Sequence, residues 1–383
     1  MEEKVCALAL NRIFGHEPAV GGALIGRFGS AASVFGASEA ELRALLPGKP
    51  DKTLSILGED LEKDREELED LQEKGMDFIP MTSEDYPALL KECNDPPVGL
   101  YYRSGSPPKK VFDERPAVAV VGTRNLTPYG KQWCIEIVGA LAAARIKPVI
   151  VSGMAYGTDF TAHSTALGRG LPTIGVLPTG IDTVYPFRHA PLARMMDEAD
   201  GCALITDYPP GTAPLPINFI RRNRIIAGLS RAVILTESRI KGGSMITARF
   251  AADYSRDLYA LPGRVDDLCS QGCNLLIRNS MAEPITDLED LVSRLGLGSV
   301  SPRSKGSFRE AVAARCAALE SRSRADEILS TAMAVKEERG IGIAALAERS
   351  GRPYHEIAAD TALLESWGFI SVDLLQRCSA NSV

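Results

Sequence analysis

Four short, mostly apolar runs recur along the middle of the chain, at residues 117–121, 148–151, 173–177 and 232–235. Stretches long enough for helices separate these runs. Runs of this kind indicate strands that are buried on both faces, as in parallel sheets covered by helices. The pattern therefore predicts an α/β fold with a doubly wound, mostly parallel sheet.

The regions on either side of this sheet have a helical pattern. Near the front, Leu54, Leu57, Leu61, Leu68 and Leu71 form an apolar stripe among charged residues. Residues 299–307 are rich in Ser, Gly, Pro, Lys and Arg, which is typical of a linker. We expect a small helical domain at 1–76, the sheet domain at 77–297, a linker at 298–324 and a small module of helices and a strand at 325–378.

Composition excludes several classes of protein. No apolar run approaches the roughly 20 residues that a membrane span needs, and the acidic start is unlike a secretory signal. The eight cysteines are scattered, so we expect reduced thiols in a cytoplasmic protein that holds no metal. A net charge of −6 means that any site for a polyanion must be a confined basic patch.

Polar loops follow the predicted strands, and such loops gather at one edge of an open α/β sheet, where ligands bind. Their hydroxyls, free backbone N–H groups and cationic side chains suit phosphate. The candidate binding residues in three of these loops are Gly122, Thr123, Arg124, Ser152, Gly153, Lys241, Gly243 and Ser244. Thr127 and Pro128 predict the start of a helix whose N-terminus can also hold an anion. The alternative for Arg124 is a structural bridge to a carboxylate.

Arg221, Arg222 and Arg224 surround Asn223 just before an apolar helical run. Cations at a helix start oppose the helix dipole, so an anion should compensate them. A phosphate backbone would do this, and so would a buried carboxylate such as Asp207 or Glu237. We interpret Arg222, Asn223 and Arg224 as binding residues and keep the carboxylate alternative open.

The loops contain no recognisable catalytic set. Asp159 and His163 lie four residues apart, which favours a hydrogen-bonded pair that orders the loop over a catalytic dyad. Ser152 lacks the G-x-S-x-G context of a nucleophile, and residues 241–244 lack the G-K-[ST] order of a phosphate-binding loop in ATPases. Only Gly122 of the G-x-G-x-x-G fingerprint is present, so we expect neither a cofactor nor an enzyme.

Residues from about 86 to 290 resemble the DNA-processing protein A family (DprA, also called Smf). The motifs that carry the resemblance are V-G-T-R at 121–124, S-G-M-A-Y-G-T-D at 152–159, G-I-D-T-V-Y-P at 180–186, R-R-N-R-I-I-A-G-L-S at 221–230 and G-G-S-M-I-T-A at 242–248. The resemblance implies a Rossmann-like sheet, a sterile-alpha-motif-like or helix-hairpin-helix-like front and a winged-helix-like tail. It further implies a homodimer that binds single-stranded DNA, protects incoming DNA and assists loading of the RecA recombinase in natural transformation.

In that family the arginine of the G-[ST]-R motif and nearby basic residues bind the single strand. The resemblance carries this role to Arg124, to Arg222, Asn223 and Arg224, and to Arg188 beside the Y-P segment. The alternative function is a nucleotide-binding or nucleoside-monophosphate-cleaving enzyme of a related Rossmann-like fold. That enzyme class uses P-G-G-x-G-T-x-x-E, and here Gly242 and Gly243 lack the preceding Pro and the Glu.

The C-terminal module presents Glu356, Asp360 and Glu365 on its expected recognition helix, against His355 and Arg352. Because acidic residues repel phosphate, we expect this module to contact protein rather than to read duplex DNA.

Overall fold

The computed structural model describes residues 2–299, 308–317, 319, 321–338, 340–373 and 375–380. The chain divides into two compact units, residues 1–300 and 301–383. Among the described residues, no helix is long and apolar enough to cross a membrane. No group of described His, Cys, Asp or Glu side chains has an arrangement that could hold a metal ion.

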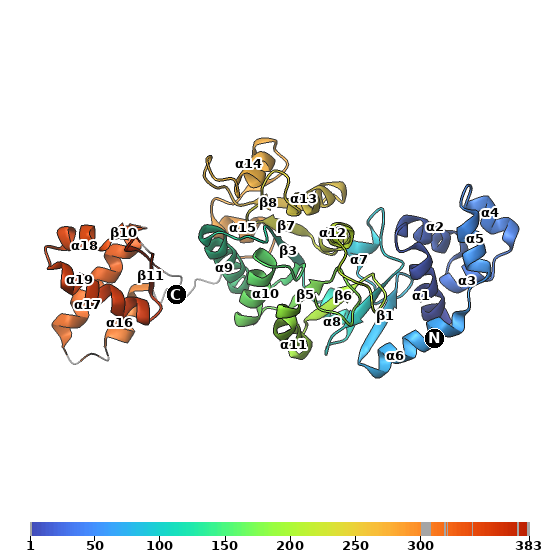
Figure 1. Ribbon diagram of the computed structural model, residues 1–383, viewed down its shortest axis with the longest axis horizontal. Helices are drawn as coiled ribbons and strands as arrows, with labels where there is room; N and C mark the ends of the chain where they lie inside the picture. The colour runs from blue at the N-terminus through green and yellow to red at the C-terminus, as the bar shows by residue number, and fades with distance from the viewer. Residues whose placement is uncertain are drawn as a thin grey trace. The chain divides into compact units, whose positions relative to one another are not determined.

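The first unit contains one large sheet with helices on both faces (Figure 1). Its strands are β1 (Met76–Pro80), β2 (Gly99–Arg103), β3 (Ala117–Val121), β4 (Val149–Ser152), β5 (Thr173–Val176), β6 (Ala203–Thr206), β7 (Ala232–Leu235), β8 (Asp257–Ala260) and β9 (Glu283–Pro284). The front helices are α1 (Glu2–Phe14), α2 (Pro18–Phe28), α3 (Ala31–Phe35), α4 (Glu39–Leu45), α5 (Pro50–Leu57) and α6 (Leu61–Glu73). The remaining helices are α7 (Ala88–Lys91), α8 (Pro108–Phe112), α9 (Pro128–Ala143), α10 (Thr158–Gly168), η1 (Phe187–His189), α11 (Ala190–Glu198), α12 (Pro216–Leu229), α13 (Ser244–Asp253), α14 (Gln271–Arg278) and α15 (Leu288–Arg294).

The strand order is β1-β2-β6-β5-β4-β3-β7-β8-β9. Strands β3 to β9 pair in parallel, while β2 pairs antiparallel with both β6 and β1. The chain runs outward from β3 through β4, β5 and β6, then returns to place β7 on the other side of β3. This change of direction confirms the doubly wound, mostly parallel sheet and creates a switch point between β3 and β7.

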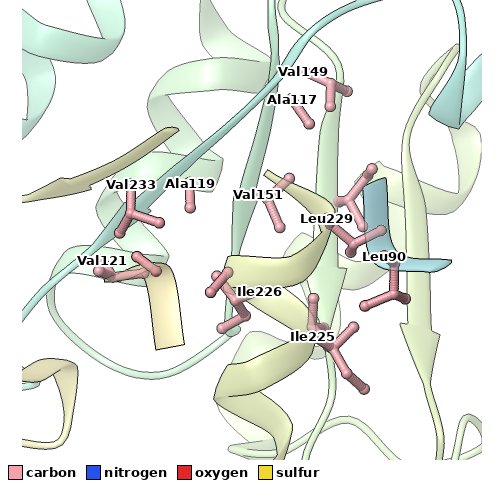
Figure 2. Close-up of a cluster of buried hydrophobic side chains, with 14 of the residues drawn as sticks. Leu90, Ala117, Ala119, Val121, Val149, Val151, Ile225, Ile226, Leu229 and Val233 are labelled. Atoms are coloured by element: carbon pink, nitrogen blue, oxygen red, sulfur yellow. The ribbon is translucent and has the colours of Figure 1, made fainter. Parts of the chain in front are cut away.

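Alternate residues of the central strands point to opposite faces, and each face has its own core. Ala117, Ala119 and Val121 of β3 face α12, whose Ile225 and Ile226 pack against them (Figure 2). The intervening residues of β3 pack in a second cluster with α9, α10 and α15. Burial on both faces explains why these strands read as continuous apolar runs.

A third cluster joins the front helices to the edge of the sheet. Leu8 and Phe14 of α1 share it with Phe78 of β1, Tyr101 of β2 and Leu204 of β6. In addition, the amide of Asn11 donates to the backbone oxygen of Asp207 at 2.9 Å. The structure therefore unites residues 1–76 with the sheet in one unit, where we expected two domains.

The second unit contains α16 (Phe308–Cys316), α17 (Arg322–Glu337), β10 (Ile341–Gly342), α18 (Ile343–Ser350), α19 (Tyr354–Ser366), β11 (Ile370–Val372) and β12 (Arg377–Ala380). From α17 onward this order fits the winged-helix-like module that the sequence predicts. The expected linker at 298–324 differs from the structure, since α16 lies inside it and its Phe308 and Val312 pack in the core of this unit. Residues 300–307 of that linker lie outside the described residues.

Candidate functional site

A cavity of about 750 Å³ opens at the switch point of the sheet. The loops after β3 and β7 and the first two turns of α12 and α13 form much of its wall. Nine of the predicted site residues line it, namely Gly122, Thr123, Arg124, Asp159, Arg222, Asn223, Lys241, Gly243 and Ser244. The structure thus brings most of the predicted loops together around one cavity.

Three cations on the cavity wall lack an ion-pair partner among the described residues. Arg124, Arg239 and Lys241 are exposed, and none of them forms an ion pair with a residue that the structure describes. The guanidinium of Arg124 lies over the ring of Phe219, 4.6 Å from its centroid. This stacking occupies one face of the guanidinium and leaves its charge available to a ligand.

Arg222 forms the deep end of the cavity and is held by the fold itself. Its side chain is 3% exposed, and its Nη1 donates to the backbone oxygens of Gly153 (2.5 Å) and Val176. Burial lowers the pKa of Arg222 to about 10. Its Nε donates to Oδ1 of Asn223 at 3.2 Å, and Nδ2 of Asn223 in turn donates to the backbone oxygen of Gly243 at 3.4 Å.

The N-terminus of α9 is already occupied. Thr127 caps this helix and Pro128 is its first residue, as predicted. However, the carboxylate of Glu237 accepts hydrogen bonds from the backbone N–H of Thr127 at 3.0 Å and from its hydroxyl at 2.5 Å. The expectation that this helix end holds a ligand anion is wrong, because a side chain of the chain itself fills the place.

The N-terminus of α13 is open by contrast. Gly243 at its start is exposed and has no side-chain cap, and a Cβ there would meet no atom within 4 Å. The hydroxyl of Ser244 donates to that of Ser238 at 2.9 Å. The N–H groups of Met245 and Ile246 donate to the backbone oxygens of Gly242 and Gly243, each at 3.1 Å, whereas those of Gly243 and Ser244 have no hydrogen-bond partner among the described residues and remain available to an anion.

Two predicted binding residues have structural roles instead. The hydroxyl of Ser152 is fully buried and donates to the backbone oxygen of Val120 at 2.7 Å. Arg224 is 6% exposed and pairs with Asp207, with Nη2 and Oδ2 2.5 Å apart. For Arg224 the carboxylate alternative is therefore the one that the structure supports. The dipole argument also fails, because α12 begins at Pro216 and places these arginines beyond its first turn.

Two further predicted residues lie outside the cavity lining. Gly153 is buried, and a Cβ there would lie 2.6 Å from Nη2 of Arg222, so this glycine makes room for the arginine. Arg188 is exposed on η1, three residues after the cavity residue Tyr185 in sequence. It forms no ion pair with any part of the chain that the structure describes.

Asp159 and His163 do not form the expected pair. Oδ2 of Asp159 accepts from the backbone N–H of Ala155 at 3.2 Å, so this carboxylate does order the loop. His163 points to the sheet instead, with its Nδ1 2.7 Å from Oγ1 of Thr173. Burial lowers the pKa of His163 to about 3 and raises the pKa of Asp159 above its ordinary value.

The cavity wall also contains residues that were not predicted, among them Arg239, Tyr185 and Phe219. Arg239 lies in the loop after β7, four residues beyond the end of the strand, and the rule that selected Lys241 would have selected it as well. The rings of Tyr185 and Phe219 meet edge to face, with centroids 5.6 Å apart. Nothing in the sequence indicated this contact between two distant segments.

The site combines a doubly wound sheet with cations that form no ion pair among the described residues and with free backbone N–H groups at the switch point, an arrangement that suits phosphate groups. The family model for DNA recombination-mediator protein A matches residues 77–296, which is more than half of the chain. The chain therefore belongs to the DNA recombination-mediator protein A family, as its motifs indicate.

Individual relatives agree with this family. Protein Smf of Synechocystis is 40% identical over 229 residues, which are 60% of this chain and 56% of that protein. The match thus spans little more than half of that relative. DNA processing protein DprA of Streptococcus pneumoniae is 38% identical over 209 residues, which are 54% of this chain and 70% of the relative.

Two solved structures are similar in fold. The X-ray structure of DprA from Streptococcus pneumoniae has a TM-score of 0.58 at 31% identity and covers 67% of this chain and 86% of its own. DprA from Helicobacter pylori has a TM-score of 0.50 at 32% identity, covering 56% and 94%, and that structure concerns a single-stranded DNA binding mode.

Proposed function

We propose that this protein binds single-stranded DNA in the switch-point cavity and acts as a recombination mediator. In this role it protects incoming DNA and assists loading of the RecA recombinase during natural transformation. The observation that carries the proposal is the set of unpaired cations, Arg124, Arg239 and Lys241, around one cavity that also has an open helix N-terminus. The DNA binding reported for the Helicobacter pylori relative supports the same ligand class.

The shape and chemistry of the cavity favour a single strand over a duplex. Its cations lie inside a concave wall, and a flexible strand can bend its phosphates into that wall more easily than a stiff duplex. The Arg124–Phe219 stack offers a flat surface to bases that are free of a partner strand. Phosphate contacts carry no base code, so we expect little dependence on sequence.

We further propose a cytoplasmic homodimer without catalytic activity. Two linked sites on one strand would raise the overall affinity well above that of either site. The carboxylate of Asp159, which lines the cavity, accepts a hydrogen bond from the backbone N–H of Ala155, and this contact favours a role in ordering the loop over one as a general base. A nucleotide ligand for the same cavity is the competing function, and the first experiment separates the two.

That experiment is a fluorescence anisotropy titration of a labelled single strand and its duplex at several salt concentrations. We expect preference for the single strand and an affinity that falls as salt rises. Arg124→Glu should weaken binding on the order of 100-fold, since it replaces a charge-assisted contact by repulsion, and should flatten the salt dependence. Arg169→Glu is the matched control, because Arg169 is exposed at the end of α10, away from the cavity lining.

Absence of binding at low salt would contradict the proposal and direct attention to small phosphorylated ligands. Equal loss in the Arg124 and Arg169 variants would show that binding follows net charge and does not use the cavity.

A further inference from the structure

We propose that Glu237 is a positioning residue that holds Arg124 in its binding geometry. This inference rests on the proposed function, because it concerns how the same cavity is prepared for single-stranded DNA. Glu237 lies two residues beyond β7, is 1% exposed and does not line the cavity. Its effect on a ligand must therefore pass through the residues that it contacts.

Those contacts fix both ends of the segment that carries Arg124. The backbone oxygen of Glu237 accepts from the N–H of Thr123 at 2.8 Å. Its carboxylate accepts from the N–H and the hydroxyl of Thr127, as described above. Thr123 precedes Arg124 directly and Thr127 follows it by three residues, so one buried residue ties down the loop on both sides.

The sequence makes room for this carboxylate. A Cβ on Gly130, in the first turn of α9, would lie 2.3 Å from Cδ of Glu237 and would displace it. The hydroxyl of Thr127 also accepts from the N–H of Gly130 at 3.1 Å, which completes the cap of α9. A carboxylate in this place is stabilised by the N–H groups and the positive end of the helix dipole.

The occupied helix end also directs the ligand. Because Glu237 fills the N-terminus of α9, an incoming phosphate has the cations and the open N-terminus of α13 as its remaining partners. A loop that is already ordered loses less conformational entropy on binding, which strengthens each contact that Arg124 makes. Loss of the Glu237 carboxylate should therefore weaken DNA binding only through Arg124. It should have no effect on affinity when Arg124 is absent.

A double-mutant cycle tests this dependence. The full chain and its variants Glu237→Gln, Arg124→Ala and the double variant are titrated with a labelled oligothymidylate. We expect roughly a tenfold loss for Glu237→Gln and a larger loss for Arg124→Ala. The double variant should bind no more weakly than Arg124→Ala alone, since Glu237 acts through Arg124. Losses that multiply, or wild-type affinity in Glu237→Gln, would overturn the inference.

A second route covers the case in which Glu237→Gln does not fold. Thr127→Val keeps the shape of the side chain and removes the hydroxyl that bonds Glu237, so it should also weaken binding severalfold and lose this effect in the Arg124→Ala background. Ser38→Ala is the matched control, because Ser38 caps α4 in the front helices, away from the cavity. Circular dichroism and thermal unfolding establish that each variant is folded, and an equal loss in both cap variants would overturn the inference.

Failure of the proposed function gives a different pattern. If wild type does not bind the oligonucleotide, or if Arg124→Ala binds as wild type does, the site itself is wrong. If Arg124→Ala weakens binding and Glu237→Gln and Thr127→Val do not, the site stands and the role of Glu237 is wrong.

Discussion

Arginines line the switch-point cavity and also gather in the C-terminal unit, but their partners differ. In the cavity, Arg124 and Arg239 form no ion pair with any residue that the structure describes, although Asp159 lines the same cavity. In the C-terminal unit, Arg352 pairs with Glu327, Glu356 and Asp360. Arg324 pairs with Glu327 and Asp360, and Arg349 pairs with Glu337 and Glu338. The same residue type therefore serves two purposes in one chain.

The comparison shows that the partner of a cation indicates its role better than its position in a motif. An arginine that a carboxylate already neutralises gains little from a phosphate, since binding must first break the existing pair. An unpaired arginine in a concave wall has no such cost. This difference supports the prediction that the C-terminal module contacts protein rather than DNA, because Arg324, Arg349 and Arg352 are already paired with carboxylates of the same unit.

The largest expected effect is on the stability of the C-terminal unit. Arg352→Met should lower the free energy of unfolding of this unit by about 3 kcal/mol, because Asp360 is fully buried and loses one of its two cations. Single-stranded DNA affinity should not change. Chemical denaturation and an anisotropy titration of the same sample check both statements. A weakened affinity would contradict the conclusion that the paired arginines of the C-terminal unit do not contact DNA.

Reversal of the two cavity cations that lie beyond β7 should have the next largest effect. We expect Arg239→Glu combined with Lys241→Glu to reduce single-strand affinity roughly 30-fold and to lower the salt slope by about 1.4, since two phosphate contacts are lost. Arg349→Glu is the control in the C-terminal unit. If the control weakens binding equally, the charge of the whole chain governs affinity and the pairing of individual cations does not.

A smaller effect is expected at the aromatic side chain beneath Arg124. Phe219→Leu keeps an apolar contact and removes the stack, so affinity should fall about fivefold. The salt slope should stay unchanged because no charge is lost. Phe250→Leu is a matched control, since Phe250 stacks on Tyr254 outside the cavity lining. A changed salt slope in Phe219→Leu would mean that Phe219 acts by placing a charge.

The smallest effect concerns pH. Burial raises the pKa of Asp159 above its ordinary value of 3.8, so this carboxylate gains a proton as pH falls through a range higher than usual. Protonation removes a negative charge from the cavity wall, and single-strand affinity should therefore rise a few-fold on acidification. Asp159→Asn should bind at neutral pH as the protonated wild type does and show less pH dependence. The same dependence in the variant would assign the effect to other groups.

Much of the fold followed from local pattern. The apolar runs gave the buried strands, and Thr127 with Pro128 gave the start of α9, because caps and continuous apolar runs depend on neighbouring residues alone. The sequence predicted a domain boundary at residue 76, but it did not predict that the regions on its two sides pack into one unit. The cluster that crosses this boundary joins Leu8 to Tyr101 and Leu204, and such contacts between distant segments leave no periodic signal.

The sequence correctly predicted which loops form the site, but for some side chains it did not predict the direction in which they point. Arg222 and Arg224 are two positions apart, so they point to different sides of α12, and one reaches the cavity while the other meets Asp207. His163 was placed by its spacing from Asp159, but a strand that lies elsewhere in the sequence supplies its partner, Thr173. Because the whole chain contains few aromatic residues, we did not expect an aromatic contact at the site, and the contact between the rings of Tyr185 and Phe219 was not predicted.

The cluster that joins α1 to β1 and β2 has a consequence for how this protein can evolve. The family match begins at residue 77, yet Phe78 and Tyr101, at the start of the matched part, are fully buried against the front helices. If the front helices were lost or exchanged during evolution, the aromatic side chains of Phe78 and Tyr101 would be exposed to solvent at the sheet edge. Polar residues would then have to replace them. Inheritance of the front region is therefore tied to the residues at the edge of the sheet, although only the sheet carries the family signature.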